Sequence, residues 1–449
     1  MAKTECRWES PNQWSEWVEW LAAGLHARNR WRLSVILLGM LFATGRRTVT
    51  TWLRAAGVST EFDDYYYCLA SVGRKTNSVS TQLLVLALRV LPLRERLLAV
   101  IDDSPTKRYG PKVEGADIHH NPTPGPADQK YLYGHVWVTI SLAVRHPWWG
   151  SMALPLRAAL YVRRKTIPTI PKKRGWRFVT KLVLAARLVE WIARIAKKSG
   201  KTLWIVIDGG YTKRPFLKRA LATGATIVGR LRKDAALRDL PPKLQKGQRR
   251  GRGRPCKYGK NKISLAKRAG QSRGWKTIEC VLYNETATKT YKTFLATYGP
   301  VGGVIRVVLV KEDHGYFAFF CTNPDANVKE IIEAFADRAT IEQGFHDVKE
   351  VWGASQQQVR NIWTNVGCFN LNLWMHTLVE LWAWDQSHAD LCNRDDSPWD
   401  DAERRPSHAD RRKALRRQIM RNELSKVAAA WWLPRKIIQL VESLMALAA

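Results

Sequence analysis

The stretch Leu97-Leu-Ala-Val-Ile-Asp102-Asp103-Ser104 decides the fold, because it is an apolar run that stops abruptly at two carboxylates. A continuous apolar run of this length is typical of a strand that is buried on both faces of a sheet. A carboxylate at the end of a core strand costs free energy unless a site uses it. We therefore predict a core strand that delivers an acidic group to a functional site.

The same pattern returns in Leu203-Trp-Ile-Val-Ile-Asp208-Gly-Gly-Tyr211, where an apolar run again ends at an aspartate. An amphipathic helix is predicted between the two runs, over residues 176–199, with Gly200 as its stop signal. A helix between two strands favours their parallel pairing, because the chain must cross back before the second strand begins. We therefore expect Asp102 and Asp208 side by side at the carboxyl ends of neighbouring strands.

Further strands are predicted on both sides of this pair. Two lie before the helix, over residues 132–144 and 150–162, and one follows the second aspartate, over residues 225–231. A run of four more is predicted over residues 277–283, 291–298, 304–310 and 316–322. These four form a β-rich insertion that separates the second aspartate from the next acidic motif.

That motif is Phe335-Ala-Asp-Arg338-Ala-Thr-Ile-Glu342-Gln-Gly-Phe-His-Asp-Val-Lys349, which is predicted to form one helix. At about 100° per residue, positions 335, 338, 342 and 349 lie within roughly 60° of one another on its surface. Glu342 on such a face can hold a cation while Arg338 and Lys349 bind phosphates beside it. The alternative is a solvated amphipathic helix in which Arg338 and Glu342 form an ordinary i,i+4 ion pair.

The charge of the chain indicates a polyanionic partner. Lys and Arg number 73 against 39 Asp and Glu, which gives a formal net charge of +34, and the basic residues run through the whole length. The seven cysteines include no C-x-x-C pair, so neither a zinc ribbon nor a disulfide framework is expected. There is no apolar leader and no uncharged apolar run of membrane-spanning length. We therefore expect a cytoplasmic, nucleoid-associated protein without membrane contact.

One candidate for DNA contact lies in the N-terminal part, which is predicted to be helical up to about residue 92. An apolar helix, a break at Thr44-Gly45 and a basic helix over residues 46–57 have the outline of a helix-turn-helix. DNA contact would then come from Arg46, Arg47 and Arg54. Any pair of antiparallel helices shows the same outline, so an ordinary helical hairpin is the alternative.

The other candidate is Arg252-Gly253-Arg254-Pro255, inside a segment dense in Arg, Lys and Gly. Such a segment is expected to be an exposed loop. Its four-residue core resembles the AT-hook, whose extended arginines enter the narrow minor groove of A·T-rich DNA. Arg252 and Arg254 would then bind DNA, and the alternative is a merely solvated basic loop.

The three acidic positions together resemble the Asp-Asp-Glu catalytic set of the DDE transposases of bacterial insertion sequences. Arg338, Glu342 and Lys349 match the Tyr-x2-Arg-x3-Glu-x6-Lys signature of that group, although Phe335 stands where tyrosine is usual. Ile-Asp-Asp-Ser, Ile-Asp-Gly-Gly-Tyr and the β-rich insertion are similar to the branch described as DDE superfamily endonucleases. The resemblance implies an α/β fold with an RNase H-like mixed sheet flanked by helices, a helical N-terminal domain and a helical C-terminal region.

The resemblance also implies a reaction. Asp102, Asp208 and Glu342 would be catalytic and would hold two Mg²⁺ ions, for which Mn²⁺ can substitute, in a phosphoryl transfer that cuts transposon ends and joins them to target DNA. The implied partners are double-stranded DNA, as ends and as target, and a second copy of the chain on that DNA. Asp103 is the alternative to Asp102, because neighbouring strand residues point to opposite faces. The Asp-x-Ser/Thr pattern that closes the first strand of RNase H-like cores favours Asp102.

These patterns divide the chain into five regions, here given with their expected roles. They are a helical DNA-binding domain (1–92), the first part of the catalytic core (93–235), the β-rich insertion with the basic loop (236–325), the second part of the core (326–390) and a helical C-terminal region (391–449). A catalytically silent DNA-binding protein that retains this fold is the alternative function. A carboxylate glycosidase is disfavoured by the net charge of +34.

Overall fold

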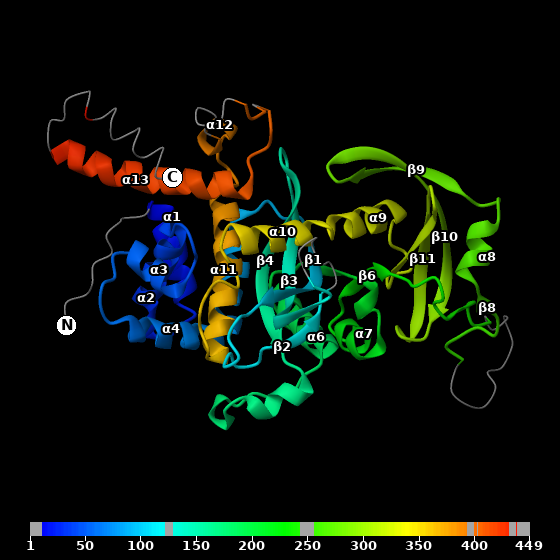
Figure 1. The fold of residues 1–449 in the computed structure, drawn as a ribbon. Helices are drawn as coiled ribbons and strands as arrows, with labels where there is room; N and C mark the ends of the chain where they lie inside the picture. The colour runs from blue at the N-terminus through cyan, green and yellow to red at the C-terminus, as the bar shows by residue number, and fades with distance from the viewer. Residues whose placement is uncertain are drawn as a thin grey trace.

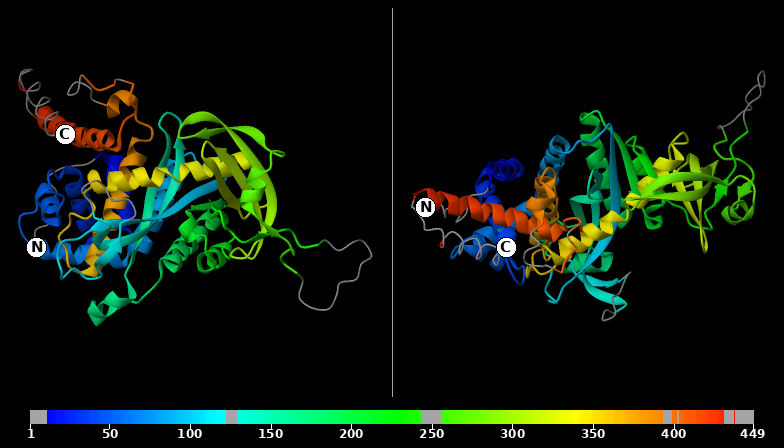
Figure 2. Two further views of the ribbon diagram at one scale, coloured as in Figure 1. Left: turned by 45° about the vertical axis from the view of Figure 1, so that its right-hand side comes forward. Right: turned by 90° about the horizontal axis from the view of Figure 1, so that it is seen from above.

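The computed structural model describes residues 11–121, 129–242, 256–392, 399–401, 403–430 and 437. Figure 1 shows three regions in a row, a helical N-terminal region, a central sheet covered by helices, and a β-rich region. The two further views in Figure 2 show the same order, with the β-rich region projecting away from the N-terminal helices. The three predicted carboxylates lie in or beside the central sheet.

Five strands form the central sheet in the order β4-β3-β1-β5-β6. Their bounds are Arg96–Lys107 for β1, Tyr131–His146 for β3, Gly150–Tyr161 for β4, Thr202–Ile207 for β5 and Thr226–Arg230 for β6. β1, β5 and β6 are parallel, whereas β3 is antiparallel to both β1 and β4. This large mixed sheet flanked by helices confirms the predicted RNase H-like class, and the predicted parallel pairing of the two aspartate-bearing strands is present.

β1 is longer than the sequence predicts. We expected the strand to end at its two carboxylates, but it continues to Lys107 by pairing with β3. Its parallel pairing with β5 stops earlier, at Ile101 and Ile207. Hydrogen bonds to one neighbour suffice to extend a strand through polar residues. Asp102 therefore lies directly after the last residue of β1 that pairs with β5, and not at the end of β1.

The β-rich insertion continues the central sheet. β12 (Gly315–Cys321) pairs antiparallel with β6, and β11 (Gly303–Glu312), β10 (Glu285–Tyr298) and β9 (Lys276–Leu282) follow as an antiparallel meander. The short elements of this region are β7 (Leu237–Arg238), β8 (Lys262–Ile263) and α8 (Leu265–Gly270). The turn between β9 and β10 reaches back to the central sheet, where the Asn284 side chain accepts a hydrogen bond from the Ser151 amide at 2.7 Å.

Helices cover both faces of the central sheet. α6 (Lys181–Lys198) and α7 (Arg214–Leu221) lie on one face, and α9 (Val328–Asp337) and α10 (Thr340–Glu350) lie on the other. Side chains alternate along β1, so Ala99 and Ile101 join the apolar cluster of α6, whereas Val100 joins the cluster of α9 and α10. This alternation decides the face on which each aspartate of β1 lies.

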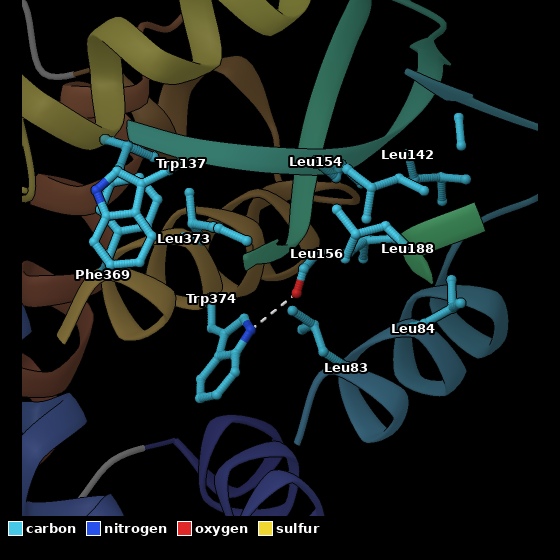
Figure 3. Close-up of a cluster of buried hydrophobic side chains, with 14 of the residues drawn as sticks. Leu83, Leu84, Trp137, Leu142, Leu154, Leu156, Leu188, Phe369, Leu373 and Trp374 are labelled. Atoms are coloured by element: carbon cyan, nitrogen blue, oxygen red, sulfur yellow. Dashed lines mark hydrogen bonds between the residues drawn. The ribbon is translucent and has the colours of Figure 1, made fainter. Parts of the chain in front are cut away.

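α11 (Ile362–Ala383) is buried along nearly its whole length and joins the helical region to the sheet, packing against α4 (Phe62–Arg74), α5 (Thr76–Val90) and β4. Trp137 of β3 stacks on Phe369 with ring centroids 4.1 Å apart. The Trp374 indole donates a hydrogen bond to the Leu156 carbonyl at 2.9 Å, and Figure 3 shows both contacts beside leucines of α5. One apolar cluster therefore runs from the N-terminal helices into the central sheet.

The remaining elements agree largely with the predicted pattern. The helical N-terminal region also contains α1 (Asn12–Ala22), α2 (Ala27–Phe42) and α3 (Val49–Ala55), and α12 (His388–Leu391) and α13 (His408–Ala430) follow α11. Three short 3₁₀ helices are η1 (Arg164–Thr169), η2 (Lys172–Arg174) and η3 (Gly209–Tyr211). β2 (Asp117–His120) was not predicted, because its loop is rich in Gly, Pro and His and it pairs only with β3. Within the described residues, no helix is long and apolar enough to cross a membrane.

Candidate active site

Asp102 and Asp208 lie next to each other on the face of the sheet that α9 and α10 cover. The parallel pairing of β1 and β5 ends one residue before each aspartate, so the two occupy equivalent positions on strands about 4.8 Å apart. Val100 and Val206, two residues earlier on each strand, belong to the apolar cluster of α9 and α10. The alternation along each strand therefore turns both carboxylates toward α10.

Asp103 lies on the opposite face, toward α6. Its carboxylate accepts hydrogen bonds from the Lys181 ammonium at 2.5 Å and from the Tyr211 hydroxyl at 3.0 Å. Burial and the charge of Asp103 raise the pKa of Tyr211 well above its ordinary value, so the hydroxyl stays a donor. Tyr211 ends η3, the turn that directly follows Asp208, and this hydrogen bond ties the turn to β1 from behind. Of the two neighbouring aspartates, Asp102 is the one that shares a face with Asp208.

Glu342 reaches this pair on α10, but the single helix that we predicted is interrupted. α9 ends at Asp337 and α10 begins at Thr340. The Thr340 hydroxyl donates to the Asp337 carbonyl at 2.7 Å, and the amides of Ile341 and Glu342 bond three residues back instead of four. This tighter winding breaks the α-helical pattern at Arg338-Ala339. The prediction of one uninterrupted α-helix is therefore wrong, although Arg338 and Ala339 keep right-handed helical φ and ψ angles and Arg338 still lies beside Glu342.

Arg338, in the junction between α9 and α10, connects the two acidic elements. Its guanidinium donates to Asp102 at 2.6 Å and lies 3.7 Å from Glu342. The Asp102 side chain is 22% exposed, whereas that of Glu342 is 69% exposed. One arginine thus links a half-buried carboxylate on the sheet to a carboxylate that projects into solvent above it.

Asp102 is held where its negative charge is unfavourable. The pKa of its carboxyl is raised to about 6, mainly by burial and also by the charges of Asp103 and Asp208, while Arg338 and the Asp103 amide act in the opposite direction. Two carboxylates that share one face repel each other, and nearby positive charge relieves this repulsion. The single guanidinium does not offset burial and this repulsion fully, so the pKa of Asp102 stays above its ordinary value.

The donor set fits a hard divalent cation, because all three side chains offer carboxylate oxygens. The carboxylates are nevertheless not gathered around one point. Within the described residues, the group of three ligand side chains with atoms within 4.8 Å of one another is His376, Glu380 and His408, far along the chain. Because Glu342 is the exposed member of the acidic set, it is the one whose side chain can move toward the other two.

The other two residues of the predicted helical face lie apart from the carboxylates. Phe335 packs on Phe319 of β12 with ring centroids 4.4 Å apart, so an apolar ring suits its surroundings. Lys349 lies in the last turn of α10, and burial lowers the pKa of its amino group. In the described part of the chain it contacts none of the three carboxylates. Its contact with phosphate therefore stays a prediction.

The second helix of the predicted helix-turn-helix begins later than expected. α3 starts only at Val49, because Thr48 caps it by accepting a hydrogen bond from the Thr51 amide at 3.1 Å. Arg46 and Arg47 consequently lie in the turn between α2 and α3, outside the helix. Arg46 is exposed and Arg47 is partly buried.

This turn is fixed to the catalytic core. The Arg47 amide donates to the Gln356 side chain at 2.7 Å, and the Gln357 side chain donates to the Arg47 carbonyl at 3.0 Å. Both glutamines belong to the loop between α10 and α11. Arg54 lies on α3 and is exposed. The structure thus leaves two of the three predicted arginines open to solvent, and DNA contact by all three stays a prediction.

Arg252 and Arg254 of the AT-hook-like motif lie outside the described residues, so their role also stays a prediction. The elements on either side of this segment, β7 and β8, pair with each other in antiparallel fashion.

Sequence reasoning missed three residues that hold the carboxylates in position: Lys181, Tyr211 and Thr340. A signal for Tyr211 was present, since it closes the same quoted stretch as Asp208. Lys181 and Thr340 had no local signal. Their roles depend on the face that α6 covers and on the junction between α9 and α10, which only the folded chain defines.

A large cleft elsewhere in the molecule does not contain the three carboxylates. It has a volume of about 1070 Å³ and lies around the beginning of β1 and the end of β3. Four of its charged side chains form two ion pairs, Arg96 with Glu330 at 2.9 Å and Arg145 with Asp337 at 3.1 Å. Because these charges pair with each other, Asp102, Asp208 and Glu342, and not this cavity, remain the candidate site.

Comparison with known proteins agrees with this assignment of the fold. The model of a family described as DDE superfamily endonuclease matches residues 21–294, which include Asp102 and Asp208 and end before Glu342. No curated protein matches the chain. Since the family match covers more than half of the 449 residues, the chain belongs to the DDE superfamily endonucleases, a family of nuclease and transposase type that acts on DNA with divalent metal ions.

Proposed function

We propose that this protein is a DNA transposase that cuts DNA at transposon ends and joins the freed ends to target DNA. The observation that carries the proposal is the placement of Asp102 and Asp208 side by side on one face, with Arg338 and Glu342 above them. Phosphoryl transfer needs both carboxylates that hold a cation and a donor that holds the phosphate. The net charge of +34 supplies attraction for DNA.

Asp102, Asp208 and Glu342 would hold Mg²⁺ in this proposal, as two ions for which Mn²⁺ can substitute. When bound, the metal supplies Lewis acidity that lowers the pKa of an attacking water or hydroxyl and stabilises charge on the leaving oxygen. The raised pKa of Asp102 supports the assignment, because a carboxyl whose pKa is shifted by burial and by a second carboxylate on the same face is typical of functional sites. The engagement of Asp103 by Lys181 and Tyr211 supports Asp102 as the first ligand.

Arg338 and Lys349 would position the DNA. The guanidinium of Arg338 lies between the sheet carboxylates and Glu342, where two parallel N–H groups can bind a non-bridging oxygen of the scissile phosphate. Lys349, about two helical turns after Glu342, would bind a neighbouring phosphate. Water would attack the scissile phosphate and displace the 3′-oxygen, which leaves as a 3′-hydroxyl while the phosphate stays on the other fragment. That 3′-hydroxyl would then attack a phosphate of the target strand and displace the 3′-oxygen of the target in turn. No covalent bond to the protein forms in either step.

The test is Mg²⁺-dependent cleavage of duplex DNA that carries the ends of the element encoding this chain. We expect Asp102→Asn, Asp208→Asn and Glu342→Gln each to reduce the cleavage rate by on the order of 10³-fold or more. DNA binding should stay close to that of the wild type, because none of these substitutions removes a positive charge. Asp103→Asn is the matched control and should retain more cleavage, since its side chain faces α6.

Two outcomes would change the proposal. Cleavage by Asp208→Asn at the wild-type rate would remove this carboxylate from the site, and cleavage by Asp102→Asn but not by Asp103→Asn would move the first ligand by one residue. Tight binding of end DNA by the wild type without any cleavage would favour the catalytically silent DNA-binding protein.

A further inference from the structure

A cleft of about 430 Å³ lies between the N-terminal helical region and the catalytic core. Three segments line it. They are the α2–α3 turn with Arg46, the chain directly after β1 with Arg108 and Tyr109, and the loop between α10 and α11 with Gln358 and Arg360. The cleft is therefore assembled from the predicted DNA-binding region and from the two elements that carry Asp102 and Glu342.

The lining of this cleft carries positive charge that no lining carboxylate balances. Its lining includes three arginines and no carboxylate. Arg108 is only 6% exposed and donates to the carbonyls of Ser355 and Gln357 at 3.0 and 2.8 Å. Burial lowers the pKa of Arg108 to about 10, so it is still a cation at neutral pH. A buried cation without a nearby acid favours an anionic ligand.

The side chains at the mouth of the cleft are open for contact. Arg46, Gln358 and Arg360 are exposed, and within the described residues their side chains make no hydrogen bond or ion pair. Tyr109 is 81% exposed and gives the mouth an aromatic face. Nucleic-acid bases stack on such rings with little dependence on sequence. A volume of this size is typical of a site for one small molecule, about 300 to 1,000 Å³, and it does not admit a double helix.

The cleft is firmly built where its segments meet. The hydrogen bonds of the Arg47 backbone to Gln356 and Gln357 join the turn to the loop. Ser355 has a φ of +99°, a conformation that residues other than glycine rarely adopt, while its carbonyl accepts from Arg108. Backbone strain of this kind persists where the surroundings impose it, and it concentrates at binding sites.

The distance from the cleft to Asp102 and Asp208 can be estimated along β1 and along the helical segment that contains α10. Arg108 is six residues beyond Asp102, which corresponds to about 20 Å along an extended strand. The helical segment from Arg338 to Val351 spans a similar length, about 20 Å at 1.5 Å per residue. Because each nucleotide of a strand occupies about 3.4 Å of helix axis, the cleft lies about six nucleotides from a phosphate at Asp102.

We propose that this cleft binds one unpaired nucleotide of the substrate DNA, about six nucleotides from the cut. Tyr109 stacks on its base, and Arg46 and Arg360 bind the phosphates on either side. The inference rests on the proposed function, because it requires a DNA strand across the acidic pair. Hydrogen bonds join the α2–α3 turn to the loop between α10 and α11. One nucleotide bound between them therefore fixes the spacing along the DNA strand between the N-terminal helical region and the carboxylates.

The test uses the full-length chain and two labelled duplexes of the same sequence, one fully paired and one with a single unpaired thymine. Fluorescence anisotropy at several salt concentrations measures binding. We expect the wild type to bind the duplex with the unpaired thymine about tenfold more tightly. Tyr109→Ala should remove this preference and Tyr109→Phe should keep it. Arg46→Ala and Arg360→Ala should each reduce the salt dependence by about one phosphate contact.

Tyr283→Ala is the matched control, because Tyr283 is 70% exposed in the turn between β9 and β10, away from the cleft, and it should bind like the wild type. Photocrosslinking from 5-iodouracil in the unpaired position should label Tyr109. Equal binding of both duplexes by the wild type, or a preference that survives in Tyr109→Ala, would overturn the inference. Failure of the proposed function would look different, since the wild type would then bind neither duplex or would cut no end DNA with Mg²⁺.

Discussion

Two clusters of charged side chains lie along α10, and they differ in what neutralises them. The candidate active site lies at its N-terminal end, where the guanidinium of Arg338 links Asp102 to Glu342 and Asp208 lies beside Asp102. The other cluster joins the C-terminal half of α10 to α11 and α13. Its members are Asp347, His376, Glu380, His408 and Arg411. By residue type and proximity, this second cluster looks more like a metal site than the first.

The hydrogen bonds of the second cluster argue against a metal. Glu380 accepts from His408 at 2.5 Å and from Arg411, and the Trp352 indole donates to Nε2 of His408 at 2.7 Å. Nε2 must therefore accept, and the proton of His408 lies on Nδ1, toward Glu380. A metal on Nδ1 would force the proton to Nε2, where it would face the N–H of Trp352. We conclude that this buried cluster is a structural network.

The comparison teaches that unsatisfied charge, and not ligand type, distinguishes the candidate site. Burial acts to raise the pKa of Glu380, but Arg411 and His408 more than offset it and leave the pKa below its ordinary value. Burial also raises the pKa of Asp102, and there Arg338 does not offset it. The buried network supplies its own counter-charges, whereas at the candidate site the pKa of Asp102 remains raised despite Arg338.

The largest effect expected is on the buried network. Glu380→Gln removes the charge that pairs with Arg411 and leaves a buried guanidinium without a carboxylate, so the free energy of unfolding should fall by about 3 to 5 kcal/mol. Chemical denaturation measures this quantity. Glu342→Gln is the control at the exposed site and should change it by less than about 0.5 kcal/mol. Similar losses in both variants would erase the distinction between the clusters.

Next in size is the effect of Arg338 on the reaction rate. Arg338→Ala should slow single-turnover cleavage of bound end DNA. The activation free energy should rise by about 1.5 to 3 kcal/mol, which is the contribution of one charge-assisted hydrogen bond. Arg338→Lys should rescue little, because lysine lacks the planar pair of donors, and Lys349→Arg should be milder. If cleavage is normal while binding to end and scrambled DNA weakens equally, both residues belong to a general basic surface.

Asp102→Asn should increase the free energy of unfolding, whereas Glu380→Gln should decrease it, and the increase should be the smaller of the two changes. The folded pKa of about 6 lies above the ordinary 3.8, so the ionised carboxylate opposes folding above pH 6 and this penalty fades as the pH falls toward 4. The variant should therefore gain about 1 to 2 kcal/mol near neutral pH, and less near pH 4. Denaturation at both pH values measures the gain, and a constant gain would argue against titration of Asp102.

The buried network should respond to acid in the opposite direction. Burial lowers the pKa of His408 to about 4, below the ordinary 6.5. Its contribution to stability is therefore complete above pH 6.5 and is lost as the pH falls toward 4, by at most about 1.4 kcal/mol per pH unit. His408→Gln should flatten this part of the stability profile. An unchanged slope in the variant would assign the acid sensitivity to other groups, such as His135.

The smallest effect concerns positive charge outside both clusters. Replacing Arg252 and Arg254 by Ala should weaken DNA binding and reduce its salt dependence by about one to two phosphate contacts, without changing the cleavage rate of bound DNA. The salt dependence of the dissociation constant is the measurement. No change in it would mean that this basic segment is only solvated.

The parts of the fold that were predictable have local signals. An apolar run that stops at an acid identifies β1 and β5, and the helix between them implies their parallel pairing, so Asp102 and Asp208 could be placed together from sequence. The extension of β1 to Lys107 could not be predicted, because it depends on pairing with β3. The interruption at Arg338 and Ala339 could not be predicted either, because it coincides with a hydrogen bond of the Thr340 hydroxyl and with backbone bonds that reach three residues back.

The buried network had no signal in the sequence at all. Its members come from α10, α11 and α13, and each alone reads as an ordinary polar residue on a helix. The cleft at Tyr109 is similar, since it exists only after the N-terminal turn has met the loop behind α10. Contacts between distant segments decide both features, and periodicity carries no information about such contacts.

The buried helix α11 also has a consequence for how the chain is made. α11 supplies the apolar surface against which α4 packs. About 290 residues separate the end of α4 from the beginning of α11. Synthesis of this stretch takes roughly 15 to 60 s. Until α11 has left the ribosome, α4 and α5 lack the helix against which they pack, although the N-terminal helices already contact one another. A prematurely terminated chain would therefore carry basic helices with exposed apolar surface, a substrate for chaperones and proteases rather than a stable DNA-binding fragment.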